Sequence, residues 1–172
     1  FDLLGSAFGT LIVVPFIEWL GAPGALLASA AMISFAAFVV RPKLRSFIVS
    51  LVFLLMVFMQ GFADWIEIDL AEFAKEPNKP MHRAIKSGGK PLESRWSSYA
   101  RTDLIDRSGD TGLNLYVDGS AGSYMFRFGG DIRKLFFLRR EAGFFPYYFG
   151  PRNNVLIIGP GGGQDLLYGL MT

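Results

Sequence analysis

Charged residues are almost absent from the first third of the chain, and this gap constrains the fold more than any other feature. Only five of the first 63 residues are charged (Asp2, Glu18, Arg41, Lys43 and Arg45), whereas fourteen of the 17 Lys and Arg residues come later. Apolar residues make up 51% of the whole chain. An uncharged, apolar segment of this length is typical of a membrane protein.

Three mostly apolar stretches, 3–20, 25–40 and 47–63, come close to the roughly 20 residues that a spanning helix needs. They are separated by G-A-P-G at 21–24 and by R-P-K-L-R at 41–45, both of which favour a break. We therefore expect residues 1–63 to form three transmembrane helices. The alternative is one or two core helices of a soluble protein, which the absence of a polar stripe in 47–63 disfavours.

Two features of these stretches suggest roles in addition to crossing the membrane. Gly5 and Gly9 have the GxxxG spacing that lets another helix approach closely, which supports packing in a bundle and leaves a homo-oligomer open. Glu18 is ionisable within an apolar segment, so a role in transport or proton relay is one hypothesis. The simpler interpretation is that Glu18, beside Trp19, reaches the headgroup region.

Residues 64–94 are expected to form an interfacial segment and a linker. Trp65 follows the last apolar stretch, where an aromatic anchor is typical. Residues 77–91 are rich in Pro, Gly, Lys and Asn, which predicts a linker with a solvated His82.

Residues 95–130 have the pattern of a small antiparallel β-hairpin domain. A strand is expected over 96–106 and a turn over 107–112. Leu113, Leu115 and Val117 then alternate with polar or aromatic residues, and 124–128 predicts a further strand.

The last part of the chain, 131–172, predicts the start of a Rossmann-like α/β domain. A helix is expected over 131–141, and Pro146 is expected to stop any further helix. The aliphatic run 155–158 predicts a buried parallel strand that leads into a glycine turn and a helix. Such a turn exposes backbone N–H groups to a ligand at a helix N-terminus. This interpretation depends on 155–158 lying in a sheet.

Several ligand classes are disfavoured by the residues present. The chain has no Cys and one His, which excludes cysteine-based zinc sites, and we expect no metal. A net charge of +2, dispersed along the chain, gives no reason to expect a nucleic acid partner. The dinucleotide fingerprint requires Gly where Gln164 stands, and the Gly-Lys-Ser/Thr of a phosphate-binding P-loop is missing. The GxGxG pattern of Gly159, Gly161 and Gly163 is similar to the first motif of S-adenosylmethionine-type folds; a turn without a ligand is the alternative.

The order of motifs resembles the spermidine synthase (aminopropyltransferase) family, in the form fused to a polytopic membrane region. The similar blocks are D-L-L-G-S-A-F-G (2–9), W-S-S-Y (96–99), L-N-L-Y-V-D-G (113–119), F-P-Y (145–147) and V-L-I-I-G-P-G-G-G-Q-D (155–165). The chain begins inside an apolar run and ends just after the glycine block, so we expect a fragment of a multi-domain membrane protein.

The resemblance implies a site and an activity. The cofactor's methionine side would be held by Gly159, Gly161, Gly162 and Gly163, with Gln164 and Asp165 at the helix start. The co-substrate would be decarboxylated S-adenosylmethionine or S-adenosylmethionine, and an amine would accept the aminopropyl group. The family has Gln after the hairpin tyrosine and Asp in the glycine loop, where this chain has Ala100 and Gly162. A transporter or scaffold with a non-catalytic, ligand-sensing domain, or a methyltransferase, therefore remains an alternative.

The expected location is the cell (inner) membrane, with several passes. The basic loop at 41–45 is expected in the cytoplasm by the positive-inside rule. Three spans would then place the cofactor domain on the opposite side, where such cofactors are scarce. We expect a cytoplasmic cofactor domain on grounds of cofactor supply, in conflict with the charge rule.

Overall fold

The computed structural model describes residues 2–67, 78–107, 109, 111–150 and 153–172. The chain forms two compact units: Phe1–Leu70 with Arg95–Thr102, and Ala71–Ser94 with Asp103–Thr172. Residues 68–77 of the expected interfacial segment and linker lie outside the described residues.

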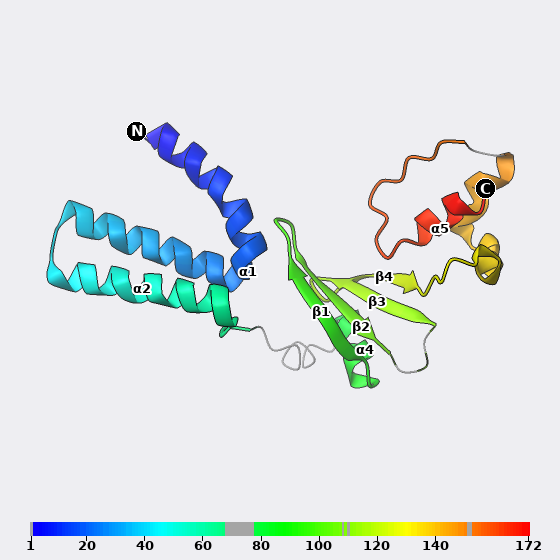
Figure 1. Ribbon diagram of the computed structural model, residues 1–172, viewed down its shortest axis with the longest axis horizontal. Helices are drawn as coiled ribbons and strands as arrows, with labels where there is room; N and C mark the ends of the chain where they lie inside the picture. The colour runs from blue at the N-terminus through cyan, green and yellow to red at the C-terminus, as the bar shows by residue number, and fades with distance from the viewer. Residues whose placement is uncertain (1, 68–77, 108, 110, 151–152) are drawn as a thin grey trace. The chain divides into compact units, whose positions relative to one another are not determined.

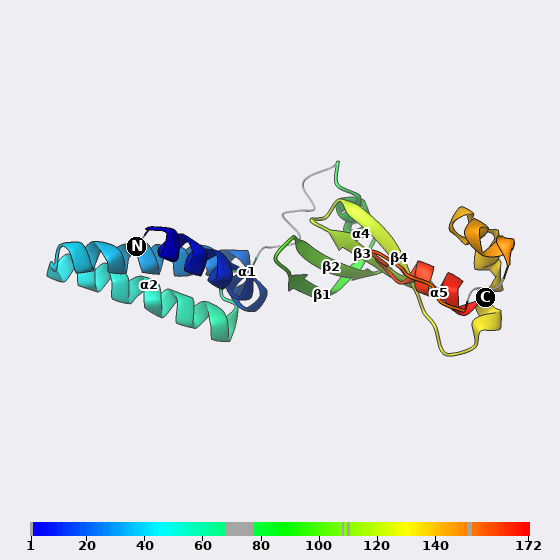
Figure 2. The ribbon, with the colours of Figure 1, turned by 90° about the horizontal axis from the view of Figure 1, so that it is seen from above.

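The first unit is built from two long apolar helices, α1 (Asp2–Val40) and α2 (Leu44–Ala63). We expected three helices, but α1 runs on through the break predicted at 21–24. It consists of two helical stretches that meet at Gly21, whose φ of 69° and ψ of 175° are not helical. Pro23 lies in the first turn of the second stretch, where its missing N–H needs no intrahelical acceptor. The second stretch lies beside α2 in both views (Figures 1 and 2).

The segment expected as a linker contains regular structure. Helix α4 (Pro80–Lys86) begins with a proline at its first position, which suits a helix start. Strand β1 (Lys90–Trp96) follows after Gly88, which has a positive φ of 92°. Composition suggested a linker because Pro and Gly are common in linkers, but here the Pro starts a helix and Gly88 lies between the helix and the strand.

The strands form an antiparallel sheet in the order β1-β2-β3-β4. The strand expected over 96–106 is confirmed only for its second half, β2 (Arg101–Asp106). Its first half contains the end of β1 at Trp96 and a turn over residues 97–100. The next pair, β3 (Gly112–Val117) and β4 (Ala121–Phe126), is antiparallel in the register Leu115↔Ser123. This hairpin turns at D-G, where Asp118 and Gly119 have positive φ of 50° and 69°, as a primed turn requires.

The second unit also contains a small core beyond the sheet. The residues expected as an α-helix over 131–141 form a 3-10 helix, η1 (Ile132–Arg140), and Asp131 accepts a hydrogen bond from the Arg133 N–H (3.2 Å). Pro146 does not stop the helical structure as predicted, because it lies inside a second 3-10 helix, η2 (Ala142–Phe149). Helix α5 (Gln164–Leu170) completes the core. The buried residues are Leu135, Leu138, Phe144, Leu167 and Tyr168.

The predicted parallel strand at 155–158 is wrong, since these residues are in no sheet. Val155 and Ile157 lie 3.9 Å from the Cβ position of Gly169 on α5, while Leu156 and Ile158 are each 87% exposed. The segment thus has the alternation of a strand without a partner. A strand needs neighbours to pair its backbone groups, and the described strands pair in one antiparallel sheet. The Rossmann-like start of the fold class is therefore not confirmed.

Candidate functional site

The six residues predicted to bind a cofactor lie in one continuous turn before and at the start of α5. Gly159, Gly161 and Gly163 all have positive φ, of 66°, 52° and 85°. An L-residue with a side chain adopts this backbone region at a cost of about 1–2 kcal/mol, which explains glycine at alternate positions. Gly159 is exposed, and a Cβ added there would meet no atom within 4 Å. The backbone at Gly159 is therefore open to a ligand.

Two glycines in the middle of the turn have a different constraint. The Gly162 N–H donates a hydrogen bond to the Ser123 Oγ of β4 at 2.8 Å. A Cβ on Gly162 would overlap the backbone of Tyr124, 2.6 Å from its carbonyl carbon, and one on Gly161 would lie 2.8 Å from Ser123 Oγ. These glycines are thus needed for the close approach of the turn to the outer strand of the sheet.

The backbone donors of the turn are partly used within the protein. Gly162 N–H is bound to Ser123, and Gly163 N–H donates to the Pro160 carbonyl at 2.8 Å. Helix geometry leaves the N–H groups of Gln164, Asp165 and Leu166 without an intrahelical acceptor. A ligand at this turn would therefore be met by the first turn of α5 and by Gly159.

The two polar side chains at the start of α5 differ in availability. The Gln164 Nε2 donates to the Tyr168 hydroxyl, so this amide is turned along the helix. The Asp165 side chain is exposed in the first turn. A carboxylate there repels an anionic phosphate and attracts a cation, so the charge of the turn favours a cationic ligand group.

Tyr168 joins the turn to the small core. It is 2% exposed and contacts the Phe144 ring edge to face, at a centroid distance of 5.7 Å. Burial raises the pKa of the Tyr168 phenol; the hydrogen bond from Gln164 opposes this shift, and the charges of Glu141 and Asp165 add to it. Tyr168 is therefore neutral at physiological pH and acts as an acceptor for Gln164.

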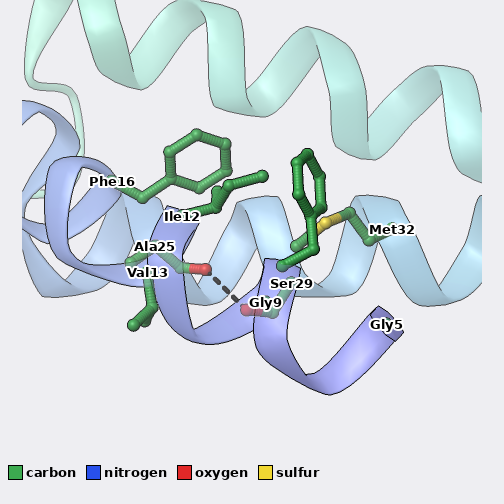
Figure 3. A pocket seen from close by; sticks show the side chains of 9 residues that line it. Gly5, Gly9, Ile12, Val13, Phe16, Ala25, Ser29 and Met32 are labelled. Atoms are coloured by element: carbon green, nitrogen blue, oxygen red, sulfur yellow. Dashed lines mark hydrogen bonds between the residues drawn. The ribbon is translucent and has the colours of Figure 1, made fainter. Parts of the chain in front are cut away.

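A groove lies between the two helical stretches of α1, with a volume of about 300 Å³ (Figure 3). Small residues line it from both stretches: Gly5 and Gly9 from the first, Ala25 and Ser29 from the second. The Ser29 hydroxyl donates to the Ala25 carbonyl at 2.9 Å, so its donor is already used. Glu18 is exposed and does not line the groove, which gives no support to a relay through it.

Buried polar residues were not singled out by the sequence analysis. Arg101 and Asp103 alternate on one face of β2 and are 5% and 2% exposed, and Asp103 accepts a hydrogen bond from Ser94 Oγ at 2.6 Å. Gln60 is buried on α2. His82, which was expected to be solvated, is instead partly buried on α4, and its buried Nδ1 has no hydrogen bond partner in the described part of the chain. The alternation of Arg101, Asp103 and Ile105 was the available signal for a covered face.

The described residues offer no group of three or more His, Cys, Asp or Glu that could hold a metal ion. Comparison with protein-family models, with curated proteins and with solved structures finds no match.

Proposed function

We propose that the protein is an integral membrane protein in which α1 and α2 lie in the lipid bilayer. The observation that carries this proposal is the exposure of their apolar side chains. The described chain has two helices long and apolar enough to cross a membrane, and only 11% and 6% of their apolar windows are buried. Exposed apolar surface of this extent is unfavourable in water, whereas a bilayer solvates it.

The helix lengths also suit a bilayer. The 20 residues of α2 extend about 30 Å, which is the thickness of the hydrocarbon core. The 39 residues of α1 would extend about 58 Å if straight, and the break at Gly21 divides them into two stretches of about 28 Å each. Each stretch can therefore cross once, and three crossings are proposed for the region.

Extraction of membranes with alkaline carbonate tests this proposal. The full chain should stay with the membrane pellet, as does a protein that spans the bilayer. Release into the supernatant would place α1 and α2 in the core of a soluble or peripheral assembly.

For the second unit, we propose that the turn from Gly159 to Asp165 binds the sulfonium of S-adenosylmethionine or its decarboxylated form. Two features support this: the open backbone at Gly159 and the exposed carboxylate of Asp165. The sheet on which the sequence interpretation depended does not include residues 155–158, so the turn alone carries this proposal.

The activity proposed on the resemblance is that of a membrane-bound spermidine synthase-like transferase. The nitrogen of an amine would attack the aminopropyl carbon bonded to the sulfonium, the carbon–sulfur bond would break, and methylthioadenosine would leave while the amine loses a proton. In such a reaction much of the rate comes from holding donor and nucleophile in line. The turn would contribute by binding the donor.

A second candidate is a transporter or scaffold in which the turn is structural or only senses a ligand. It is favoured by the hydrogen bonds that already occupy the N–H groups of Gly162 and Gly163. Calorimetry of the full chain in detergent separates the candidates. Heat with the decarboxylated cofactor or methylthioadenosine supports the transferase or a ligand-sensing domain, and only the transferase should release methylthioadenosine when an amine is added. Heat with S-adenosylmethionine alone favours a methyltransferase, and no heat with any of them leaves a structural turn.

The side of the membrane is a separate proposal. We propose a cytoplasmic second unit, because that is where a sulfonium cofactor is supplied, despite the basic residues Arg41, Lys43 and Arg45 between the spans. A topology reporter fused after Pro91 should be active on the cytoplasmic side; activity on the far side would overturn this placement.

A further inference from the structure

The outer face of η1 combines aromatic and basic side chains. The helix buries Leu135 and Leu138, three residues apart, as the repeat of a 3-10 helix requires. The remaining residues form an exposed surface with the order basic pair, aromatic pair, basic pair. We name it the basic-aromatic face; its residues are Arg133, Lys134, Phe136, Phe137, Arg139 and Arg140.

The two aromatic side chains of this face are only partly covered by the rest of the protein. Phe136 is 46% exposed and Phe137 is 51% exposed, although Phe137 also contacts the Phe126 ring at a centroid distance of 5.7 Å. Exposed aromatic rings also occur in the next helix, η2, at Phe145 and Phe149. Rings left in water by a folded segment favour an apolar phase.

The charges of the face are only partly neutralised. Arg133 pairs with Asp131, Nε to Oδ1 at 3.0 Å, and the Arg139 guanidinium lies 5.8 Å from the Phe136 centroid and 5.3 Å from the Phe144 centroid. Lys134 and Arg140 have no acidic partner within the residues that the structure describes. Glu141 is the other nearby acid, so the segment 131–141 carries four basic and two acidic residues and a net charge of +2.

We propose that the basic-aromatic face docks on the surface of a membrane rich in anionic phospholipid. Lys134, Arg139 and Arg140 would lie at the phosphate groups while Phe136 and Phe137 enter the boundary of the acyl chains. Exposed aromatic rings beside basic residues are the features of an interfacial segment. Nucleic acid is the other polyanion to consider, since its bases can stack on exposed rings. The dispersed net charge of +2 gives no further reason to expect it, and the oligonucleotide arm below tests it. This contact goes beyond anchoring by α1 and α2, because it can fail while both helices remain in the bilayer.

The absence of Cys from the chain allows a clean test, since any introduced Cys is unique. The full chain carrying Phe136→Cys is labelled with a fluorophore whose emission shifts to the blue in an apolar environment, then placed in nanodiscs of neutral or anionic lipid. Ser120→Cys, at an exposed position in the turn between β3 and β4 of the same unit, is the matched control. The label at 136 should shift to the blue in anionic nanodiscs, revert at high salt, and stay unshifted in neutral ones; the control label should not respond.

A charge variant supplies the second arm. Lys134→Gln with Arg140→Gln removes two cations without disturbing the Arg133–Asp131 pair, and should lower the ratio of inserted to free label by about 30-fold, equivalent to about 2 kcal/mol. Lys86→Gln with Lys90→Gln makes the same charge change elsewhere on exposed positions and should leave the ratio unchanged.

Three results would overturn the proposal. Equal emission from the label at 136 in neutral and anionic nanodiscs would show that anionic lipid does not drive docking of the face. An equal effect of the two charge variants would show that only the total charge matters. A shift that appears only after addition of an oligonucleotide would assign the face to nucleic acid.

Discussion

Gly159 and Gly162 are both glycines of the same turn, yet they are constrained differently, and substitution should separate them. Gly162→Ala should destabilise the turn by about 1–3 kcal/mol, because the new Cβ would overlap the Tyr124 backbone and weaken the bond to Ser123. Hydrogen exchange of β4 and α5 measures the effect. Gly159→Ala meets no atom and should cost only the positive-φ penalty of about 1–2 kcal/mol, confined to the turn itself.

If the Gly159 and Gly162 variants expose β4 to exchange equally, the turn does not pack on that strand, and the structural role assigned to Gly162 is wrong.

Because Tyr168 is buried, we expect the stability of the small core to depend on pH. Its pKa is raised above the usual value of about 10 chiefly by burial, so the folded state favours the neutral phenol. The stabilisation is fully present below about pH 10 and is lost as the pH rises through the raised pKa. Difference titration of near-ultraviolet tyrosine absorbance should show one late component that is missing in Tyr168→Phe. An unchanged titration curve in that variant would refute the burial of the phenol.

At the scale of elements, the exit from α2 depends on a buried amide. Gln60 is 3% exposed; its Oε1 accepts the Ile66 N–H at 2.9 Å and its Nε2 donates to the Ile66 carbonyl at 3.3 Å. Gln60→Leu has a similar size but leaves both backbone groups of Ile66 unpaired, which should cost about 1–3 kcal/mol. Thermal unfolding in detergent measures the loss, and Gln60→Glu, which keeps an acceptor for the Ile66 N–H, should lose less. If Gln60→Leu is as stable as the original chain, the Gln60 amide does not stabilise the backbone at Ile66.

The break at Gly21 predicts an arrangement of the connecting segments. If each stretch of α1 crosses once, Ala22 and Glu67 lie on one side of the membrane and Lys43 lies on the other. Single Cys variants at these three positions, treated with an impermeant thiol reagent in sealed vesicles, should react in that pattern. Reaction of Ala22→Cys and Lys43→Cys from the same side would show that the stretches of α1 do not both span.

The elements that the sequence predicted well depend on local chemistry. The apolar stretches need only composition, and β3 with its D-G turn needs only alternation and a residue that tolerates positive φ. The predictions fail where the structure of a segment depends on a pairing partner far away in the sequence. Residues 155–158 have the residue types of a strand and its alternation along α5, but without a neighbouring strand they form no ladder. The Pro and Gly residues around α4 predicted a linker, but the same residue types also begin helices and precede strands. Composition alone does not distinguish these cases.

The candidate site shows the same division. Alternate glycines before a helix predicted a turn with an exposed backbone, and the positive φ of Gly159, Gly161 and Gly163 agrees with it. The contact of Gly161 and Gly162 with β4 joins residues almost forty positions apart, which no local pattern contains. The burial of Arg101 and Asp103 likewise depends on what covers the sheet.

At the scale of the whole molecule, we propose different solvents for the apolar helical part and the polar part that contains the sheet. The first leaves most of its apolar side chains exposed, while the second has a core at Leu138, Phe144 and Tyr168. The account of function depends on the bilayer being the solvent of the first part. The proposals for the glycine turn and the basic-aromatic face are separate from this claim, because each of them can be wrong while the claim about the bilayer is right.

The most direct test of the bilayer claim is a depth profile along α2. Leu51, Leu55 and Phe58 are exposed positions on this helix, and each can be replaced by a single spin-labelled Cys in the full chain reconstituted in vesicles. The account predicts high collision rates with molecular oxygen and low rates with a water-soluble nickel chelate, most extreme near the middle of the helix. Free access of the nickel chelate to all three labels, or exclusion of both reagents by surrounding protein, would contradict it.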